Sequence, residues 1–307
     1  MSRLQTLAPA KINLGLFVGP LRADGKHELV SVMQPISLAD RVRIESLPIE
    51  SVARASEDEV ICPGVDGENL AAAALELFRS ATGWKGGPVR VSIDKRIPVA
   101  AGLGGGSADA GAALRLAQAA SGLGDAGLLL ELAAQLGADV PAQVAPRRTL
   151  ALGAGERLQA LVAPSVPLGV LVLAQRTGLS TASVYAQVDR LQAPRDSYEL
   201  GRQRDALRAA LAAGVQLPAA ELLANDLQEA SRQLSGAVAP ALAQARDAGA
   251  DRVFVSGSGP TVVGLFEGED GPRRAQAAAA GLAGRAPAAV AAETVNGDFA
   301  AVRPLRA

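Results

Sequence analysis

The stretch from Pro98 to Ala113, PVAAGLGGGSADAGAA, combines residues that could bind an anion. Its glycines let the backbone approach a ligand closely, and the alanine-rich run that follows favours a helix. The first N–H groups and the positive dipole end of that helix would face the loop, which suits a phosphate group, although such a loop can also be a simple tight turn. The stretch is neither a Walker loop, because no lysine follows the glycines, nor a dinucleotide fingerprint, because Ser107 stands where the third glycine should be.

A second chemical signal is the scarcity of lysine. The chain has 30 lysine and arginine residues together, and only Lys11, Lys26, Lys85 and Lys95 are lysines. Arginine therefore serves as the general surface cation, and a position that keeps lysine can require a compact point charge in place of a planar fork. Three of these lysines lie in motifs with glycine or proline, as does the single histidine, His27. The alternative is that these four lysines remain by chance codon usage. The occurrence of three of them in motifs of the same kind as that of the single histidine favours a functional role for those three.

Asp139 is a third candidate for chemistry. It lies within Gly137–Pro141, GADVP, directly after a helical pattern. Gly137 fits the C′ position of that helix, and Pro141 predicts that the helix does not resume, so we expect Asp139 in a short, rigid, non-helical connection. A carboxylate in such a place is commonly a solvated turn residue or a cap, and that alternative stays open on the pattern alone.

The elements that must position these residues are mostly β in the first third of the chain. Between Pro9 and Val18 apolar residues alternate with Lys11 and Asn13, which predicts a strand with one buried face and a polar pair directed into a cleft. Asp24–Gly25 predicts the turn that follows. The same reasoning predicts strands at Leu29–Ile36, Asp40–Ser46 and Val89–Ile93. It also predicts helices at Leu70–Thr82 and Asp125–Gly137, with a further helix that begins directly after the glycine loop.

The pattern loosens near residues 153–167, where prolines recur, and this predicts a domain boundary. We expect one domain at residues 1–155 and another at residues 156–307. The second half begins with an apolar strand at Gly169–Ala174 and continues through helices, with a cap at Asn225–Leu227. The segment Arg252–Phe266 then predicts a strand, a glycine–serine turn and a strand, whose hydroxyl and N–H groups could close over a ligand held by the first domain.

Composition limits the class of protein. With 307 residues, 49% hydrophobic and 20% charged, the chain has the profile of a soluble globular protein with room for two domains. A formal net charge of −1 argues against nucleic acid or an anionic membrane as a partner. The single Cys62, the lack of any apolar run near the roughly 18 residues of a membrane span, and the lack of a targeting pattern predict a cytoplasmic protein. One histidine and one cysteine cannot form a zinc site, so we expect no metal held by protein ligands.

Three motifs in this order are similar to those of a known family. AxAKINLGL begins at Ala8, PxxxGLGGGSADA at Pro98 and SGSGPT at Ser256. They closely resemble the signature motifs of the galactokinase, homoserine, mevalonate and phosphomevalonate kinase (GHMP kinase) superfamily. The resemblance implies an α+β fold, a two-domain α/β sandwich with the active-site cleft between the domains and ATP as phosphoryl donor. The domain at residues 1–155 would then bind ATP, and the domain at residues 156–307 would lie on the substrate side.

Finer details resemble one branch of this superfamily, whose acceptor is a cytidine diphosphate conjugate of methylerythritol in the non-mevalonate isoprenoid pathway. The matching segments are Arg22–His27, Ser92–Pro98, Gly137–Pro141 and Asn225–Leu227, and the resemblance runs from Pro9 to at least Phe266. It implies an ATP-dependent kinase that phosphorylates a hydroxyl group of this small molecule.

The resemblance also implies a role for each motif. Asp139 would accept the proton of the acceptor hydroxyl, and Lys11 would keep it ionised and offset charge on the moving phosphoryl group. His27 and Tyr185 would hold the cytosine. The ATP-binding positions would be Asn69, Leu70, Lys95, Pro98, Gly102, Leu103, Gly104, Gly105, Gly106, Ser107 and Ala108, and the substrate-binding positions would be Asn13, Lys26, His27, Thr181, Tyr185, Gly257, Ser258 and Gly259.

The sequence departs from the family pattern at two positions and differs from the mevalonate branch at a third. The family commonly has a tyrosine before the histidine, stacked on cytosine, where this chain has Lys26, and the change bears on the strength of cytosine binding. A second serine commonly follows the glycines where this chain has Ala108. In the mevalonate branch a serine at the position of Gly106 helps to hold magnesium, so here the resemblance implies Mg²⁺ held mainly by phosphates and water.

Three other functions stay open at this point. Another kinase of the superfamily would act on mevalonate, homoserine or a sugar, whereas His27 and Tyr185 favour a flat base in the pocket. A non-catalytic paralogue that senses a sugar or nucleotide would be expected to lack Lys11 or Asp139, and both are present. Dinucleotide-dependent oxidoreduction needs the true glycine fingerprint and an acidic residue about 20 positions later on a following strand, whereas a helix is predicted after the loop.

Overall fold

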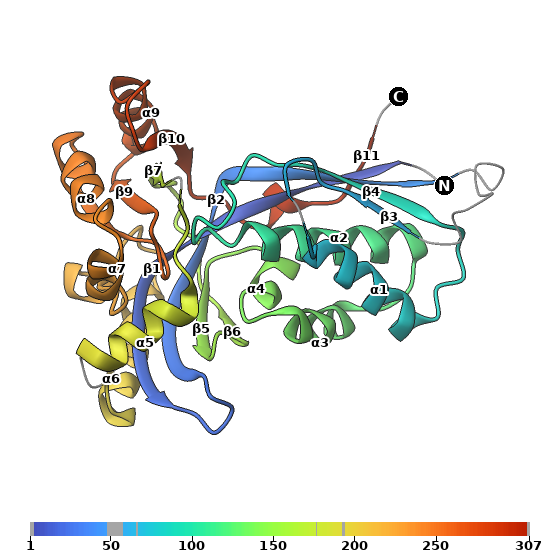
Figure 1. The fold of residues 1–307 in the computed structure, drawn as a ribbon, viewed down its shortest axis with the longest axis horizontal. Helices are drawn as coiled ribbons and strands as arrows, with labels where there is room; N and C mark the ends of the chain where they lie inside the picture. The colour runs from blue at the N-terminus through green and yellow to red at the C-terminus, as the bar shows by residue number, and fades with distance from the viewer. Residues whose placement is uncertain (1–2, 48–57, 66, 176, 192–193, 306–307) are drawn as a thin grey trace.

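Two β-sheets with helices packed against them form the described part of the chain, residues 3–47, 58–65, 67–175, 177–191 and 194–305 of a computed structural model (Figure 1). The first sheet contains β1 (Leu4–Leu21), β2 (His27–Ser46), β3 (Glu59–Ile61), β4 (Val89–Asp94), β5 (Thr149–Gly153), β6 (Arg157–Ala160) and β11 (Arg303–Pro304). Its order is β11-β1-β2-β4-β3, with β5 paired to β2 and β6 to β5. The second sheet contains β7 (Gly169–Ala174), β8 (Arg252–Val255), β9 (Val262–Phe266) and β10 (Ala288–Glu293), in the order β10-β7-β9-β8. The predicted α+β class is confirmed.

β1 and β2 form a long antiparallel pair that carries several of the predicted site residues. The predicted strand at Pro9–Val18 is confirmed, but both of its faces are buried from Ala8 to Gly19, whereas the alternation predicts only one. Part of the cover comes from the second half of the chain. Leu16 N donates to Ala224 O, and Asp226 N donates to Leu16 O, both at 2.9 Å.

The prediction of separate strands at Leu29–Ile36 and Asp40–Ser46 is wrong, because the single strand β2 runs through both. Pairing with β1 is present on both sides of residues 36–38, so that Pro35 lies opposite Lys11 and Ala39 lies opposite Pro9. The register shifts between these two pairs, and a β-bulge takes up the extra residues. A bulge leaves no turn signal in the sequence, so the alternation alone does not distinguish one bent strand from two.

The helices of the first half are α1 (Leu70–Thr82), α2 (Gly105–Ser121), α3 (Ala126–Leu136) and α4 (Val140–Val144). α1 has the predicted bounds, because Asn69 Oδ1 accepts the N–H of Ala71 at 2.9 Å and Gly83 ends the helix with a φ of 63°. α2 lies along the first sheet, with α1, α3 and α4 packed around it (Figure 1). Its buried face is mostly alanine and glycine, so these helices approach it closely.

The expectation that Pro141 prevents a further helix is wrong. α4 begins at Val140 with Pro141 in its first turn, and Asp139 occupies the N-cap position. Proline is well tolerated there because the first N–H groups of a helix have no internal partner and its fixed φ suits the helix. Asp139 is therefore held at the start of a short helix instead of within an irregular loop.

The second half contains α5 (Thr181–Leu191), α6 (Ser197–Leu211), η2 (Ala220–Leu223), α7 (Gln228–Leu234), α8 (Val238–Asp247), α9 (Gly271–Gly281) and η3 (Gly297–Ala300). The predicted strand at Gly169–Ala174 and the predicted hairpin, formed by β8 and β9, are confirmed. The division of the chain at residue 155 stays a proposal, and the strands β6 and β11 after it pair within the first sheet. None of the described helices is long and apolar enough to cross a membrane.

Arg148 ties the first sheet to the second half of the chain. Its Nε donates to Gln34 Oε1 at 2.7 Å, and Nη1 and Nη2 donate to the carbonyl oxygens of Val215 at 2.8 Å and Gln216 at 2.9 Å. Burial lowers the pKa of Arg148 to about 10, so the guanidinium stays charged at neutral pH. Three directed hydrogen bonds thus offset the cost of burying this cation.

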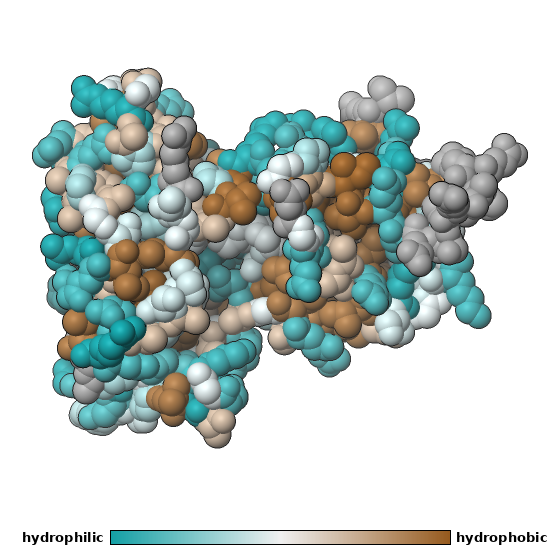
Figure 2. Space-filling view, viewed as in Figure 1, coloured by the Kyte–Doolittle hydropathy of each residue, from teal (hydrophilic) through white to brown (hydrophobic). Residues whose placement is uncertain are grey.

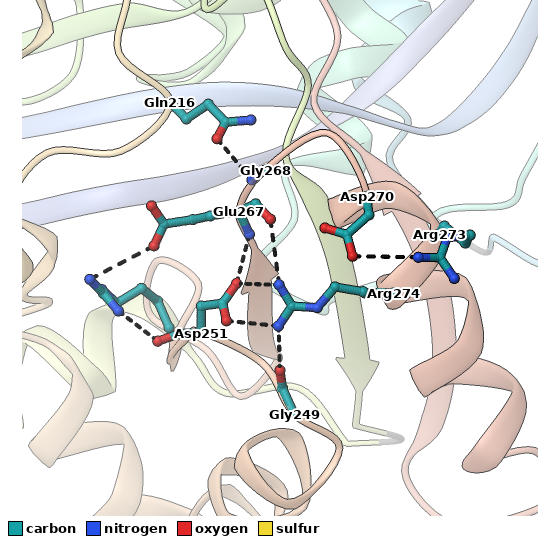
Figure 3. A network of polar contacts seen from close by, with 9 residues as sticks. Gln216, Gly249, Asp251, Glu267, Gly268, Asp270, Arg273 and Arg274 are labelled. Carbon is teal, nitrogen blue, oxygen red and sulfur yellow. Dashed lines mark hydrogen bonds and ion pairs between the residues drawn. The ribbon is translucent and has the colours of Figure 1, made fainter.

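A polar network joins α9 to the base of the β8–β9 hairpin (Figure 3). Arg274 binds both carboxylate oxygens of Asp251, with Nη1 3.0 Å from Oδ2 and Nη2 2.8 Å from Oδ1. The same carboxylate accepts the N–H of Glu267 at 2.8 Å, and Arg274 donates to Gly249 O at 3.1 Å. The hydrogen bonds from Arg274, together with that from Glu267, hold the pKa of Asp251 below its ordinary value.

We expect Asp251→Asn to lower the free energy of unfolding by about 1 kcal/mol near neutral pH, because a two-pronged charged contact is stronger than a simple surface ion pair. The folded-state pKa of Asp251 is lowered, so its contribution is fully present above the unfolded pKa of about 3.9 and is lost as the pH falls through the folded-state pKa. Thermal unfolding of both proteins from pH 7 downward checks this. The Tm difference should persist to about pH 4 and shrink below it, and equal Tm values at pH 7 would contradict the prediction.

Candidate active site

The glycine loop between β4 and α2 has a left-handed backbone and close neighbours on two sides. Gly102 and Gly104 have φ values of 73° and 70°, which favour glycine. A Cβ on Gly102 would lie 2.8 Å from Gly259 O, and one on Gly104 would lie 3.1 Å from Lys11 Cγ. Lys11 N also donates to Leu103 O at 2.9 Å. The loop is therefore fixed between β1 and the β8–β9 turn, and no side chain caps the N-terminus of α2.

A cavity of about 350 Å³ on one side of this loop gathers most of the positions predicted to bind ATP. Ala108 is the exception, because it is fully buried in the first turn of α2, where its N–H donates to Gly104 O at 2.9 Å. The other positions line the cavity: Asn69, Leu70, Lys95, Pro98, Gly102, Leu103, Gly104, Gly105, Gly106 and Ser107. The cavity thus joins the start of α1, the end of β4 and the free N-terminus of α2, which suits an anionic nucleotide.

Two buried carboxylates that the sequence analysis did not identify hold Lys95. Its Nζ lies 2.5 Å from Asp40 Oδ2 and 2.8 Å from Asp109 Oδ2. Asp40 is fully buried, and its Oδ1 accepts the N–H groups of Arg96 and Ile97. Burial lowers the pKa of Lys95, but the carboxylates outweigh burial and raise the pKa above its ordinary value. Lys95 is therefore a fixed cation at the nucleotide cavity, and its freedom to reach a ligand is restricted.

A second cavity, of about 590 Å³, shares Gly102, Gly104 and Ser107 with the first. Figure 2 shows the surface hollowed between the part that carries α1 to α4 and the part that carries α5 to α9. Of the remaining predicted positions only Gly259 lies outside its lining, which includes Lys11, Asn13, Lys26, His27, Asp139, Thr181, Tyr185, Gly257 and Ser258. The two cavities meet at the glycine loop, so groups bound in them would lie side by side. We refer to them as the nucleotide cavity and the acceptor cavity.

Lys11 and Asp139 face each other in the acceptor cavity beside Gly104. Lys11 Nζ lies 3.1 Å from Asp139 Oδ2 and donates to Asn13 Oδ1 at 2.9 Å. The Lys11 side chain is 8% exposed and that of Asp139 is 31% exposed, so the carboxylate is open to the cavity while its partner is shielded. Asp139 gives no side-chain cap to α4. Such a carboxylate can accept a proton from a hydroxyl group, and such a lysine can offset developing negative charge.

Asn13 is oriented by Ser31, a residue that the sequence analysis missed. Asn13 Nδ2 donates to Ser31 Oγ at 2.7 Å, and Ser31 Oγ donates to Gly15 O at 2.8 Å. This hydrogen-bond chain turns Asn13 Oδ1 toward Lys11. Both side chains are almost completely buried, so the amide has little freedom to turn over. Ser31 lies in a strand with no motif around it, and only the pairing of β1 with β2 reveals its role.

His27 and Tyr185 lie against each other at the acceptor cavity, with ring centroids 5.5 Å apart and planes inclined by 19°. His27 Nδ1 lies 2.9 Å from Gly19 O and carries a proton, because a carbonyl oxygen only accepts. Nε2 lies 3.2 Å from Asp189 Oδ1, a partner that the sequence did not indicate. Both ring nitrogens of His27 are therefore engaged within the protein. Burial, with a smaller effect of the charge of Asp139, raises the pKa of Tyr185 to about 12, so its phenol stays neutral.

The turn between β8 and β9 closes the acceptor cavity from the second half of the chain. Asn225 Nδ2 donates to Val255 O at 2.7 Å and to Gly257 O at 2.8 Å, which anchors the turn. Thr181 Oγ1 and Ser258 Oγ lie 3.0 Å apart, so the start of α5 also contacts it. The prediction of a cap at Asn225–Leu227 is wrong, because Leu227 is the N-cap of α7 and no side chain caps that helix. Asn225 Oδ1 accepts the N–H of Leu227 at 2.9 Å instead, so Asn225 holds the chain before α7 as well as the β8–β9 turn.

The sequence matches two family models that together cover more than half of the chain. These are "GHMP kinases N terminal domain" at residues 69–146 and "GHMP kinases C terminal" at residues 203–283. The chain therefore belongs to the GHMP kinase family. A solved homoserine kinase from Cytophaga hutchinsonii, 15% identical, covers 99% of this chain and 98% of its own with a TM-score of 0.70, which shows the shared fold.

Curated relatives narrow the comparison to one kind of GHMP kinase. A protein of Anaeromyxobacter dehalogenans is 39% identical over 92% of this chain and 86% of its own length. One of Rhodococcus jostii is 40% identical over 89% of this chain and 87% of its own. Both are named 4-diphosphocytidyl-2-C-methyl-D-erythritol kinase. A crystal structure of 4-(cytidine 5'-diphospho)-2C-methyl-D-erythritol kinase is 37% identical, covers 95% of this chain and 100% of its own, and has a TM-score of 0.75.

Proposed function

We propose that the protein transfers the γ-phosphoryl group of ATP to a hydroxyl group on the methylerythritol part of 4-diphosphocytidyl-2-C-methyl-D-erythritol, in the non-mevalonate isoprenoid pathway. The observation that carries this proposal is the Lys11–Asp139 pair beside the glycine loop that borders both cavities. The names of the relatives support the choice of acceptor.

In the proposed reaction the acceptor hydroxyl lies between Asp139 and the γ-phosphate. Asp139 accepts the hydroxyl proton as the new O–P bond forms and the bond from the γ-phosphorus to ADP breaks. Lys11 offsets negative charge on the transferred group, and Asn13 holds the ammonium in place. Because the transition state of phosphoryl transfer is loose, positioning and charge neutralisation supply most of the rate, and the base acts late.

The triphosphate would lie against the N-terminus of α2, where Gly105, Gly106 and Ser107 offer N–H groups without internal partners. The part of the chain that the structure describes contains no group of three or more His, Cys, Asp or Glu side chains that could cage a metal. This donor set fits Mg²⁺ held mainly by phosphates and water, with oxygen atoms of Ser107 and Asp139 available at the acceptor cavity. Bound in this way, Mg²⁺ would neutralise phosphate charge.

The base of the acceptor would rest on Tyr185. Because the rings of His27 and Tyr185 already contact each other, we propose that the base stacks against the face of Tyr185 that borders the cavity. Lys26 is exposed beside it and can lay its methylene stem along the base. His27 would act by supporting the tyrosine ring and through its backbone, since both of its ring nitrogens are engaged.

Tyr185→Ala should raise KM for the cytidine substrate about 5- to 150-fold, because stacking of a base on an aromatic ring is worth about 1 to 3 kcal/mol. Lys26→Ala should raise this KM only slightly, and Lys26→Tyr should lower it by adding a ring. KM for ATP should change little in all three variants. Steady-state kinetics with each substrate varied in turn measures these values. An unchanged cytidine KM in Tyr185→Ala would show that the base binds elsewhere.

A coupled assay of ADP release tests the acceptor. The purified protein is given ATP with the cytidine diphosphate conjugate, with its uridine counterpart, or with mevalonate, homoserine or galactose. We expect the cytidine conjugate to react with the highest kcat/KM, and a product analysis should locate the new phosphate on the methylerythritol part. Preference for another acceptor, or equal reaction of the two conjugates, would overturn the assignment of the acceptor and leave the family unchanged.

We further propose that the protein works on small molecules in the cytoplasm, without nucleic acid or a membrane as partner. The net charge of −1 supports the lack of nucleic acid or an anionic membrane as a partner. A single cysteine supports a reducing compartment. Fractionation of cells that express the protein checks its location.

A further inference from the structure

α4 is the short helix that presents Asp139, and its position depends on α2. The two helices are in backbone contact, because a Cβ on Gly111 of α2 would lie 2.5 Å from Gln143 O and 2.6 Å from Gln143 C. Figure 1 shows α4 beside α2, directly below it in this view. Gln143 is 2% exposed, and its Oε1 has no hydrogen-bond partner among the described residues. The Gln143 side chain therefore does little to hold α4, and the contacts of its backbone with α2 matter more.

Arg115 lies one turn after Gly111 on α2 and supplies the polar part of this contact. Its Nη1 donates to Gln143 O, and its Nη2 donates to Leu7 O at 2.9 Å and, more weakly, approaches Thr6 Oγ1 at 3.4 Å. Burial lowers the pKa of Arg115 to about 10, so it stays charged at neutral pH. No carboxylate pairs with it in the described residues, and backbone carbonyl groups serve as its main acceptors.

The two carbonyl groups that Arg115 joins belong to the two elements that carry the proposed catalytic pair. Leu7 lies four residues before Lys11 on β1, and Gln143 lies four residues after Asp139, one helical turn along α4. We propose that Arg115 is a positioning residue for phosphoryl transfer, which sets the separation of Lys11 and Asp139 by tying β1 to α4. This inference rests on the proposed role of Asp139.

Lysine could not replace arginine in this task without a loss. The planar guanidinium donates in two fixed directions, to β1 and to α4 at once, whereas a lysine ammonium on a flexible stem has no such fork. With one tie lost, α4 could tilt about its contact at Gly111 and displace the carboxylate at its start. A displacement near 1 Å of a reacting group can cost about 100-fold in rate.

A double-mutant cycle separates positioning from general stability. In the wild-type background, Arg115→Lys should lower kcat about 10- to 100-fold with little change in KM for ATP or for the acceptor. In an Asp139→Asn background, measured by single turnover at high enzyme concentration, the same change should lower the rate less than 3-fold, because the group that Arg115 positions no longer acts as a base. Arg115→Gln, which keeps one amide donor, provides a second variant and should show the same non-additivity.

Arg148→Lys is the matched control, because Arg148, like Arg115, is an arginine held by oxygen acceptors whose pKa burial lowers to about 10, and because it lies outside the proposed site. It should lower Tm without lowering kcat at a temperature where both proteins are folded. The proposal is overturned if Arg115→Lys and Arg115→Gln leave kcat unchanged, or if they lower the rate equally in both backgrounds. A failure of the proposed function would look different, because the wild type would then not phosphorylate the acceptor or Asp139→Asn would keep its full rate.

Discussion

Replacing Asp139 by asparagine should lower kcat by roughly 10²- to 10⁴-fold, the usual share of general-base catalysis. Asparagine keeps the shape of the side chain and can still contact Lys11 Nζ, which lies 3.1 Å from the carboxylate, but it cannot accept the hydroxyl proton. The start of α4 should be unaffected, since Asp139 provides no side-chain cap to that helix. Steady-state kinetics should therefore show a loss confined to kcat, with KM for ATP close to that of the wild type.

Asp125→Asn is the matched control for this experiment. Asp125 occupies the N-cap of α3, where its Oδ1 accepts the N–H of Leu128 at 2.9 Å, and asparagine caps a helix about as well. We expect its kcat to equal that of the wild type. Near-normal turnover of Asp139→Asn would show that Asp139 is only a turn residue, which is the alternative that its sequence context leaves open.

Lys11→Arg should cause a loss of about 10²- to 10³-fold in kcat, although the charge is kept. The lysine stem lies against Gly104, where even a single added carbon would come within 3.1 Å of Lys11 Cγ. The ammonium is held by Asn13 Oδ1 at 2.9 Å and by Asp139, and the residue is 6% exposed. A guanidinium is larger and planar, so it would displace either the glycine loop or the carboxylate. Kinetics with both substrates at saturation measures the loss.

Lys85→Arg is the control, because Lys85 is exposed, lies outside both cavities and stands in none of the motifs. It should behave as the wild type. If Lys11→Arg also turned over normally, the scarcity of lysine in this chain would carry no information about function. Circular dichroism of both variants should show the wild-type fold, which would confine the difference to the site.

The fold was predictable where the signal is local. Asn69 and Gly83 delimit α1, and Asp125 and Gly137 delimit α3, because caps act within one turn of the residues that they stabilise. The errors arise where distant pairing decides the outcome. β2 is one strand because β1 pairs with it on both sides of an irregularity near Ser37, and no residue there indicates this in the sequence. Pro141 signals a break, yet it also suits a first helical turn, and the sequence alone does not choose.

The residues that line the two cavities were largely predictable, and their supporting partners were not. Motifs identify side chains that approach a ligand, so Lys11 and Asp139 stand out from the sequence. Their partners lie on other elements, and only the folded structure brings them together. Ser31 contacts Asn13 from the neighbouring strand, and Asp40 contacts Lys95 across 55 positions of chain. Asp109 also binds Lys95, but it lies within the glycine motif itself, so its role as a partner could have been predicted from the sequence.

The membership of β6 and β11 in the first sheet has a consequence for how such kinases can diverge. β11 lies at the far end of the chain and pairs with β1, at Leu4 and Gln5. One apolar core also contains Ile12 and Phe17 from the first half together with Leu207 and Phe254 from the second. A chimaera with its halves taken from two different kinases would have to match this shared core as well as the sheet edge. The acceptor preference is therefore expected to change through substitutions around the cavity more readily than through exchange of whole halves.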